Sequence, residues 1–268
     1  MIKNIAIFGL GVVGGAFQKA LMARGFDGWT LRVDPRLQKS HTPKEFRNVE
    51  IAFICVPTPT LQSGLQDLSA ICSTLRFLCE AKVLGFDGLA CIRSTVTPEN
   101  VRFLQRAYPL NITTLPEFLT EANAEQDSYE SLFFVVGACG EHSAILSPFL
   151  AELWPDSKMK HTTPAGAMMF KYLVNNHLAV RISVTNELKL YWDAHGDTAW
   201  KEVTDLILLE EKRLGCSHYG VPGPDGKLGF GGKCFPKDLK AIAACSFLDG
   251  ALCGALRIND HVRGDDNA

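Results

Sequence analysis

The sequence predicts an α/β protein, with a doubly wound parallel sheet over residues 1–161 and an all-helical domain over residues 162–268. Short apolar segments alternate with helix-like segments in the first part, a pattern typical of a parallel sheet that carries helices on both faces. The pattern changes at Pro164. From there to His195 the chain contains no further proline and a single glycine, which indicates one long helix.

The first part contains six predicted strands, at residues 5–8, 29–33, 49–56, 89–93, 112–115 and 132–136, each short and apolar. A helix is predicted at 12–24, and helical segments fit between most of the other strands. In the second part we expect helices at 164–195, 198–211 and 235–245. Thr163 suits the N-cap of the long helix and Pro164 its first position. Because this helix is longer than most in globular proteins, we expect it to connect domains or to form a dimer interface.

Composition excludes several classes of protein. The 268 residues carry 27 basic and 29 acidic side chains, a formal charge of −2. Binding to nucleic acid or to an anionic membrane surface normally requires a basic excess, so neither partner is expected. No segment approaches the ~20 apolar residues that span a bilayer. The nine cysteines form no CxxC pair, which argues against zinc ribbons and disulfide frameworks, so we expect a cytoplasmic protein without a metal site.

A dinucleotide-binding fingerprint follows the first predicted strand. Gly9, Gly11 and Gly14, with Val12 and Val13 between the last two, form a G-x-G-x-x-G pattern that opens a helix. The glycines permit a tight turn, close approach of the backbone to a pyrophosphate, and packing of the helix on the strand. Such a site belongs to a Rossmann-like domain.

The second predicted strand ends at Asp34, 20 residues beyond Gly14, where a ribose-binding carboxylate is expected. Asp34 favours the 2′-hydroxyl of NAD over the 2′-phosphate of NADP, although Arg36 lies near. Ligands of doubly wound sheets bind at the carboxyl ends of the strands. The cofactor contacts predicted at the next two strand ends are Val56, Pro57, Thr58, Ser94 and Thr95.

The segment from Gly229 to Asp238 carries the most reactive side chain. Its glycines let the backbone close around a ligand, and Cys234 follows where a helix is about to begin. A thiol beside a helix N-terminus and two lysines, of which Lys237 is one, is expected to have a lowered pKa and to act as a nucleophile.

Two further pairs of polar residues have helical spacing. Glu117 and Glu121 lie four apart after a predicted strand, and on a helical turn they would share a face where either could act as a base. Lys171 and Asn175 lie four apart on the long helix. Each pair also has a simpler interpretation, a solvated face.

These motifs together resemble the UDP-glucose/GDP-mannose dehydrogenases over nearly the whole chain. The resemblance rests on the glycine fingerprint, VPTP at 56–59, STV at 94–96, PEFLTE at 116–121, K-x-x-x-N at 171–175, Asn186-Glu187, Arg213-Leu214-Gly215 and GFGGKCFPKD at 229–238. Order and approximate spacing agree. The resemblance implies NAD-dependent oxidation of a nucleotide sugar at C6, from alcohol to carboxylate, in two hydride transfers.

The resemblance also implies roles for individual residues. Cys234 would hold the substrate as a thiohemiacetal and then as a thioester, with Glu121 as the base for hydrolysis and Glu117 in support. Lys171 would stabilise oxyanions, and Asp238, with a water held by Thr95 and Asn175, would help deprotonate the alcohol. The implied cofactor contacts include Lys237, and the implied substrate contacts are Glu117, Phe118, Leu119, Lys171, Asn175, Arg213, Tyr219, Phe230, Gly231 and Cys234. Because the matching arginine of the family reaches across a dimer interface, a homodimer through the central helix is implied.

The sequence departs from the family pattern at four places. Met168 stands where the family usually has Glu, and Glu211 where it usually has Asp. Residues 224–227 look like an insertion before the cysteine loop. Typical members continue into a second Rossmann-like domain that helps to hold the nucleotide, whereas these 268 residues reach only the central helices, so the sequence does not name the nucleotide.

Two other functions stay open. A β-hydroxyacid dehydrogenase would share the glycine fingerprint and the helix lysine, with an asparagine four residues later, but would make one hydride transfer and need no thiol. An NAD-binding partner protein without catalysis of its own is the third interpretation.

Overall fold

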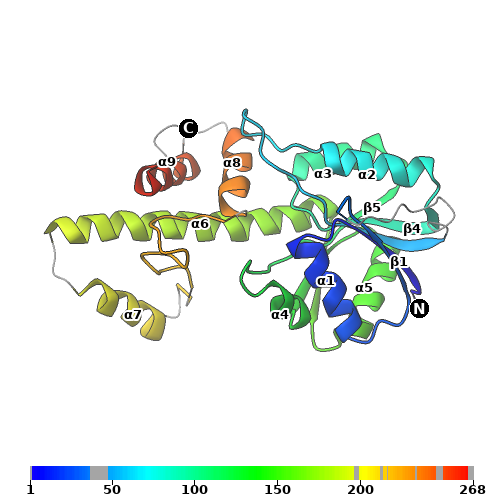
Figure 1. The fold of residues 1–268 in the computed structure, drawn as a ribbon, viewed down its shortest axis with the longest axis horizontal. Helices are drawn as coiled ribbons and strands as arrows, with labels where there is room; N and C mark the ends of the chain where they lie inside the picture. Colours follow the sequence, from blue (N-terminus) through cyan, green and yellow to red (C-terminus); the bar gives the residue numbers. More distant parts are fainter. Residues whose placement is uncertain are drawn as a thin grey trace. The chain divides into compact units, whose positions relative to one another are not determined.

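The computed structural model describes residues 2–36, 48–195, 199–211, 214–215, 217–232, 234–245 and 250–264. The chain divides into two compact units (Figure 1). Unit 1 consists of Met1–Pro59 and Gln66–Lys171, and unit 2 of Thr60–Leu65 and Tyr172–Ala268. The boundary between the units therefore falls at Lys171, inside the long helix, whereas the boundary predicted at residue 161 lies within the last strand of the sheet.

Within the described residues, unit 1 contains a seven-stranded sheet in the order β2-β1-β3-β4-β5-β6-β7. The strands are β1 (Asn4–Phe8), β2 (Trp29–Val33), β3 (Val49–Ile54), β4 (Leu84–Ile92), β5 (Asn111–Thr114), β6 (Phe133–Gly137) and β7 (Lys158–Thr162). All pairs among β1 to β5 are parallel, as the alternating pattern predicted.

The end of the sheet differs from the prediction. β6 pairs antiparallel with β5 through Thr114 and Gly137, and β7, which was not predicted, pairs parallel with β6. In an antiparallel pair the second strand starts on the side of the sheet where the first strand ends. The connection between β5 and β6 therefore begins and finishes on the side of the sheet where β5 ends. That connection contains Glu117 and Glu121.

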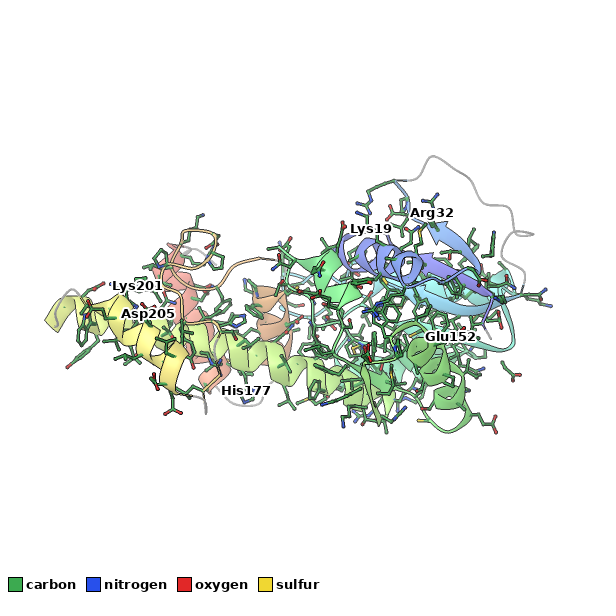
Figure 2. All side chains as sticks on the ribbon, turned by 90° about the horizontal axis from the view of Figure 1, so that it is seen from below. Lys19, Arg32, Glu152, His177, Lys201 and Asp205 are labelled. Atoms are coloured by element: carbon green, nitrogen blue, oxygen red, sulfur yellow. The ribbon has the colours of Figure 1, made fainter. Side chains whose placement is uncertain are left out.

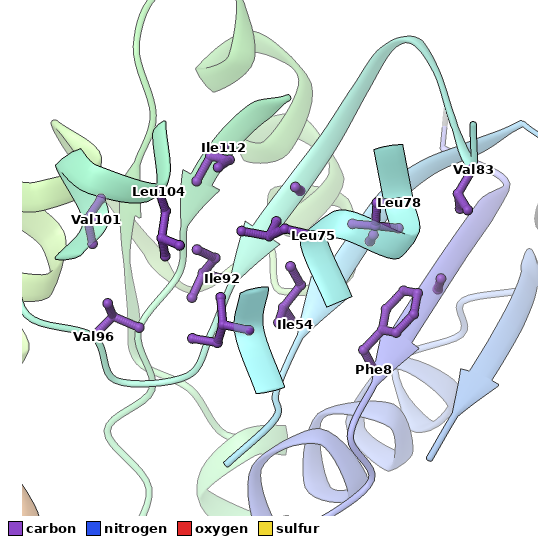
Figure 3. Packing of buried hydrophobic residues seen from close by; sticks show 14 of the residues in the cluster. Phe8, Ile54, Leu75, Leu78, Val83, Ile92, Val96, Val101, Leu104 and Ile112 are labelled. Carbon is purple, nitrogen blue, oxygen red and sulfur yellow. The ribbon is translucent and has the colours of Figure 1, made fainter. Parts of the chain in front are cut away.

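Helices cover both faces of the sheet, as predicted (Figure 1). One face carries α2 (Ser69–Glu80) and α3 (Pro98–Ala107) over a core that includes Phe8, Leu75 and Leu104 (Figure 3). The other carries α1 (Val12–Ala23) and α5 (Glu141–Leu153), with α4 (Ala124–Tyr129) packed on α1, over a core built around Phe17, Phe53 and Trp154. Rings of Phe17 and Trp154 stack with centroids 6.0 Å apart.

The long helix α6 (Pro164–His195) has the predicted bounds. The hydroxyl of Thr163 accepts the backbone N–H of Gly166 at 3.1 Å, which confirms Thr163 as the N-cap. Since helical N–H groups at a first turn lack partners in the helix itself, this bond helps to fix where α6 begins.

Unit 2 is helical. It contains the part of α6 beyond Lys171, α7 (Trp200–Glu210), α8 (Phe235–Cys245) and α9 (Ala251–Arg263). The bounds of α8 match the prediction, α7 begins two residues later than expected, and α9 was not predicted. Figure 2 shows Lys201 and Asp205 one turn apart on α7, where they form an ion pair of 2.6 Å. Within the described ranges, no helix combines the length and the apolar character needed to cross a membrane.

The close packing of α1 on β1 makes a first prediction. A Cβ at Gly14 would lie 1.9 Å from the carbonyl oxygen of Gly9, whereas one at Gly15 would come no nearer than 3.4 Å to any atom. We expect Gly14→Ala to lower the free energy of unfolding by about 1–3 kcal/mol, because backbone must move. Gly15→Ala is the matched control and should be neutral or stabilising by up to about 1 kcal/mol, through helix propensity. Equal urea midpoints for the two variants would contradict this packing.

Candidate active site

The glycine-rich turn between β1 and α1 has the geometry that its fingerprint requires. Gly9 has φ of +83°, and a Cβ there would lie 2.6 Å from the carbonyl oxygen of Cys55. In contrast, a Cβ at Gly11 would meet no atom within 4 Å. The backbone of Gly11 is therefore open to close approach by a ligand, as expected for a pyrophosphate at a helix N-terminus.

Asp34 lies directly after β2 and is already fully engaged. Its Oδ2 accepts the backbone N–H of Leu10 at 2.6 Å and an Arg36 Nη2 at 2.7 Å. Its Oδ1 accepts the Nε of Arg36 at 2.8 Å and the Arg36 backbone N–H at 2.9 Å. The Arg36 guanidinium, followed in effect by the Leu10 N–H, holds the pKa of Asp34 well below its usual range against the effect of burial.

Since a carboxylate offers about four lone-pair positions, a ribose hydroxyl has to displace one of these donors from Asp34. Arg36 is the donor that can leave, because its side chain is 68% exposed whereas that of Asp34 is 6% exposed.

The ends of β3 and β4 are joined by polar side chains. Ser94 Oγ donates to the carbonyl of Val56 at 2.7 Å, and Thr58 Oγ1 donates to the carbonyl of Thr95 at 3.0 Å. Pro57 lies between Val56 and Thr58 in sequence. The structure thus brings together the cofactor contacts predicted at these two strand ends.

Two buried residues near the ends of β3 and β4 were not predicted from the sequence. Gln66 donates to the carbonyl of Thr95 at 3.1 Å and accepts the N–H of Thr97 at 2.9 Å, so it fixes the loop after β4. Arg93 is 3% exposed, with its guanidinium 4.0 Å from the Phe17 ring centroid, and its Nε and Nη1 have no hydrogen-bond partner in the part of the chain that the structure describes. A charged residue ending the apolar segment 89–92 was the available signal for Arg93.

Glu117 and Lys171 form a buried ion pair of unit 1. Lys171 Nζ lies 3.1 Å from Glu117 Oε1, and the two side chains are 3% and 6% exposed. Glu117 Oε2 accepts the N–H of Leu119 at 2.7 Å, and Lys171 Nζ lies 5.3 Å from the ring centroid of Phe118. The predicted contacts Glu117, Phe118, Leu119 and Lys171 therefore lie together.

Glu117 and Glu121 are not on a helical turn, contrary to the prediction. Residues 115–120 form no helix, because Glu117 uses its own carboxylate to accept the N–H of Leu119, and α4 begins only at Ala124. Glu121 is exposed and lines an open groove of about 620 Å³ with Leu10, Gly11, Val12, Gly15 and Lys19, among others. The two carboxylates thus have different surroundings, one beside Lys171 and one beside the glycine turn.

Unit 2 contains a second polar cluster, at the start of α8. Asp238 is 1% exposed, and it accepts the Nδ2 of Asn175 at 2.6 Å and the Nζ of Lys237 at 2.6 Å. Its backbone N–H donates to the carbonyl of Cys234 at 2.9 Å, and Cys234, which is exposed, immediately precedes the first turn of α8. Asp238 and Asn175, which the resemblance assigned to one proton-transfer step, are therefore in direct contact, with Lys237 and Cys234 beside Asp238.

The remaining predicted substrate contacts belong to the packing of unit 2 or lie outside the description. Phe230 is 2% exposed and packs with Ala179, Leu239 and Ala255, next to Gly231. Tyr219 is buried, and its hydroxyl donates to the carbonyl of Leu214. Arg213 lies outside the described residues.

The surroundings of Met168 account for one departure from the family pattern. It is fully buried in the apolar core that also contains Val96, Val101 and Ala165. A glutamate at this position would place a charge in that apolar core, so the apolar residue suits its surroundings.

Two family models match this chain. Residues 30–154 match the NAD-binding domain of the UDP-glucose/GDP-mannose dehydrogenase family, and residues 165–251 match its central domain. The chain belongs to this family. The matched regions contain the strand-end residues, the Glu117–Lys171 pair and the cluster on α8.

One curated relative and two solved structures illustrate what the chain is similar to. The UDP-glucose 6-dehydrogenase of Rickettsia typhi is 31% identical over 205 residues, which is 74% of this chain but 45% of the relative's length. A UDP-glucose dehydrogenase structure from Pyrobaculum islandicum has a TM-score of 0.77 at 24% identity, covering 97% of this chain and 68% of that chain. A 3-hydroxyisobutyrate dehydrogenase structure from Mycobacterium tuberculosis has a TM-score of 0.70 at 18% identity, covering 99% and 95%. The last two likenesses concern the fold alone.

The residues present fit the NAD of the family's first domain. The open backbone at Gly11, the N-terminus of α1 and the carboxylate of Asp34 lie at the carboxyl ends of β1 and β2, where a dinucleotide binds in doubly wound sheets. Bound NAD⁺ supplies an oxidant that accepts a hydride from a substrate carbon.

The buried ion pair makes the second prediction. Lys171→Met keeps the length of the side chain but leaves the Glu117 carboxylate buried and unpaired. We expect a loss of about 3–5 kcal/mol in the free energy of unfolding, measured by urea denaturation. The double variant Lys171→Met/Glu117→Gln removes the orphaned charge and should recover at least half of that loss. A single variant that costs less than about 1 kcal/mol would show that the pair is not buried in solution.

Proposed function

We propose that this protein oxidises a nucleotide sugar at C6 from alcohol to carboxylate, with two NAD⁺ consumed per molecule. The observation that carries the proposal is the cluster on α8, where an exposed Cys234 lies one turn before a buried Asp238 that is bonded to Asn175. A single-step dehydrogenase needs no thiol beside its acid–base group, whereas a two-step oxidation needs a nucleophile that retains the aldehyde.

The residues divide the chemistry as follows. Asp238, with a water that Thr95 and Asn175 would hold, takes the proton of the C6 hydroxyl as hydride passes from the carbon to NAD⁺. The Cys234 thiolate then adds to the aldehyde carbon, a C–S bond forms, and the carbonyl oxygen becomes an alkoxide that Lys171 stabilises. Loss of a second hydride from this carbon gives a thioester.

Hydrolysis completes the cycle. A water attacks the thioester carbon, its proton passes to a carboxylate, the C–S bond breaks and Cys234 leaves as thiolate. The sequence favours Glu121 as this base, with Glu117 in support. The contacts support Glu117 as the base and Glu121 as the supporting carboxylate. Glu117 lies against Lys171, whereas Glu121 lines the groove beside the glycine turn.

Membership of the family supports this substrate class, since the Rickettsia typhi relative is named UDP-glucose 6-dehydrogenase. The product would be a nucleotide sugar acid, the kind of donor used in polysaccharide biosynthesis. The cysteine content supports a reducing compartment, the cytoplasm, as the place of action.

The third prediction tests the two-step reaction. Purified protein with NAD⁺ and a panel of UDP- and GDP-sugars should form two NADH per sugar acid with at least one substrate, measured at 340 nm against product by chromatography. Cys234→Ser should stop after the first oxidation, with no more than one NADH per sugar. Cys139→Ser is the matched control, because Cys139 is an exposed cysteine of unit 1 outside the proposed site, and should retain the wild-type ratio.

A β-hydroxyacid dehydrogenase is the second candidate, because the 3-hydroxyisobutyrate dehydrogenase structure is matched over 95% of its length. In that case Cys234→Ser would leave the rate unchanged and a small hydroxy acid would be oxidised. NAD binding without turnover of any nucleotide sugar or hydroxy acid would instead favour a non-catalytic partner protein. Either result would overturn the two-step proposal.

We further propose that the protein is a homodimer that pairs through α6. Exposed residues recur at helical spacing along this helix of unit 2, namely Leu173, His177, Val184, Leu188 and Tyr191. Four of them are large apolar or aromatic residues, 46%, 47%, 55% and 64% exposed in chain order. Apolar stripes of this kind usually mark a protein–protein interface.

The fourth prediction concerns this stripe. In sedimentation at micromolar concentration the wild type should be a dimer, and Leu188→Glu should be a monomer because it buries a charge in the interface. Leu132→Glu replaces an 80% exposed leucine of unit 1 and should remain dimeric. A monomeric wild type, or equal dissociation of both variants, would overturn the assignment of the interface to α6.

A further inference from the structure

The loop that leads to Cys234 is held by side chains from two other helices of unit 2. The backbone N–H of Gly229 donates to Oδ1 of Asn186 on α6 at 3.0 Å. The next N–H, that of Phe230, donates to Oδ1 of Asn259 on α9 at 2.6 Å. Both asparagines are buried, at 2% and 5% exposure. Two consecutive N–H groups of the loop are therefore fixed by separate helices.

Arg263, at the end of α9, holds the preceding carbonyl. Its Nη1 donates to the carbonyl of Leu228 at 3.1 Å, and its Nη2 donates to Asp225 Oδ2 at 2.9 Å. Asp225 belongs to the segment 224–227 that the sequence marks as an insertion, so in this chain the insertion helps to orient Arg263.

The loop can approach these side chains because Gly229 and Gly231 have no Cβ atom. A Cβ at Gly229 would lie 2.5 Å from Asn259 Oδ1, and one at Gly231 would lie 2.7 Å from Arg263 Nη2. Gly229 also has φ of +72°, which favours glycine. The glycines of this loop thus make room for α9 as well as for a ligand.

The hydrogen bond from the loop to Asn259 is not needed to pack α9 on α6. Ser183 on α6 already joins the two helices, since its Oγ donates to the carbonyl of Ala255 at 2.9 Å. The Oδ1 of Asn259 accepts a hydrogen bond from the loop and not from α6. A buried amide aimed at one backbone N–H fixes a position, and loss of its acceptor leaves that N–H without a bond.

We propose that Asn259 is a positioning residue for Cys234, acting with Asn186 and Arg263 through the backbone of the loop Gly229–Gly232. The inference rests on the proposed two-step oxidation for its catalytic meaning. Cys234 has to meet the aldehyde before it escapes, and misplacement of a reacting group by about 1 Å can cost on the order of 100-fold in rate. Loss of the Asn259 acceptor should therefore let aldehyde leave the enzyme.

The fifth prediction compares Asn259→Leu with Ser183→Ala. Asn259→Leu keeps side-chain volume and removes the acceptor, whereas Ser183→Ala removes an α6–α9 bond that does not touch the loop. In Asn259→Leu we expect at least a 10-fold fall in kcat, an unchanged KM for NAD⁺, and a fall in NADH per sugar from two towards one, with aldehyde captured by semicarbazide. In Ser183→Ala the NADH ratio should stay at two even if the Tm falls equally.

Deuterium exchange separates failure of this inference from failure of the proposed function. Peptides over residues 226–235 should exchange at least 5-fold faster in Asn259→Leu than in wild type, and Ser183→Ala should show no such change. This readout needs no turnover. Equal exchange in both variants, or an NADH ratio of two in Asn259→Leu, would overturn the inference. If Asn259→Leu does not fold, Arg263→Met, which releases the Leu228 carbonyl, should show the same shifts in smaller size.

Discussion

A lysine ammonium and a glutamate carboxylate can be buried together only if each neutralises the other, and Lys171 and Glu117 meet this condition in unit 1. The pair connects the loop after β5 with the first part of α6. Because removal of either partner would leave a buried charge, the loop cannot move away from the helix without a large loss of free energy. The position of Phe118 and Leu119 beside the pair follows from that constraint.

Unit 2 obeys the same rule with a different set of groups. Asp238 is buried with Lys237 and Asn175 as its partners, and these bonds tie the first turn of α8 to α6. Cys234 is exposed, whereas Asp238 and Asn175 are buried and Lys237 is partly buried. In the proposed function Cys234 is the nucleophile, and it follows a loop whose backbone is held by Asn259.

Local patterns predicted much of this molecule, and tertiary contacts account for the rest. The strands β1 to β5, the cap at Thr163 and the length of α6 follow from apolar period and from N-cap chemistry, which act over a few residues. The environments of Glu117 and Glu121 did not follow, because one carboxylate bonds its own loop. Asn259 carries no sequence signal, since its role depends on a loop 29 residues away. The antiparallel direction of β6 was not predicted either, because strand direction depends on pairing within the sheet and not on the local sequence.

The proposed function requires a covalent bond between Cys234 and the sugar, and a carboxylate beside Lys171 that releases the product. The most direct measurement uses Glu117→Gln protein, mixed with NAD⁺ and a nucleotide sugar that the wild type oxidises, quenched in acid and digested for mass spectrometry. If the proposed function holds, the peptide containing Cys234 carries the mass of the sugar acyl group, because the thioester forms and is not hydrolysed. An unmodified Cys234 peptide, in a variant that forms sugar acid at the wild-type rate, would contradict it.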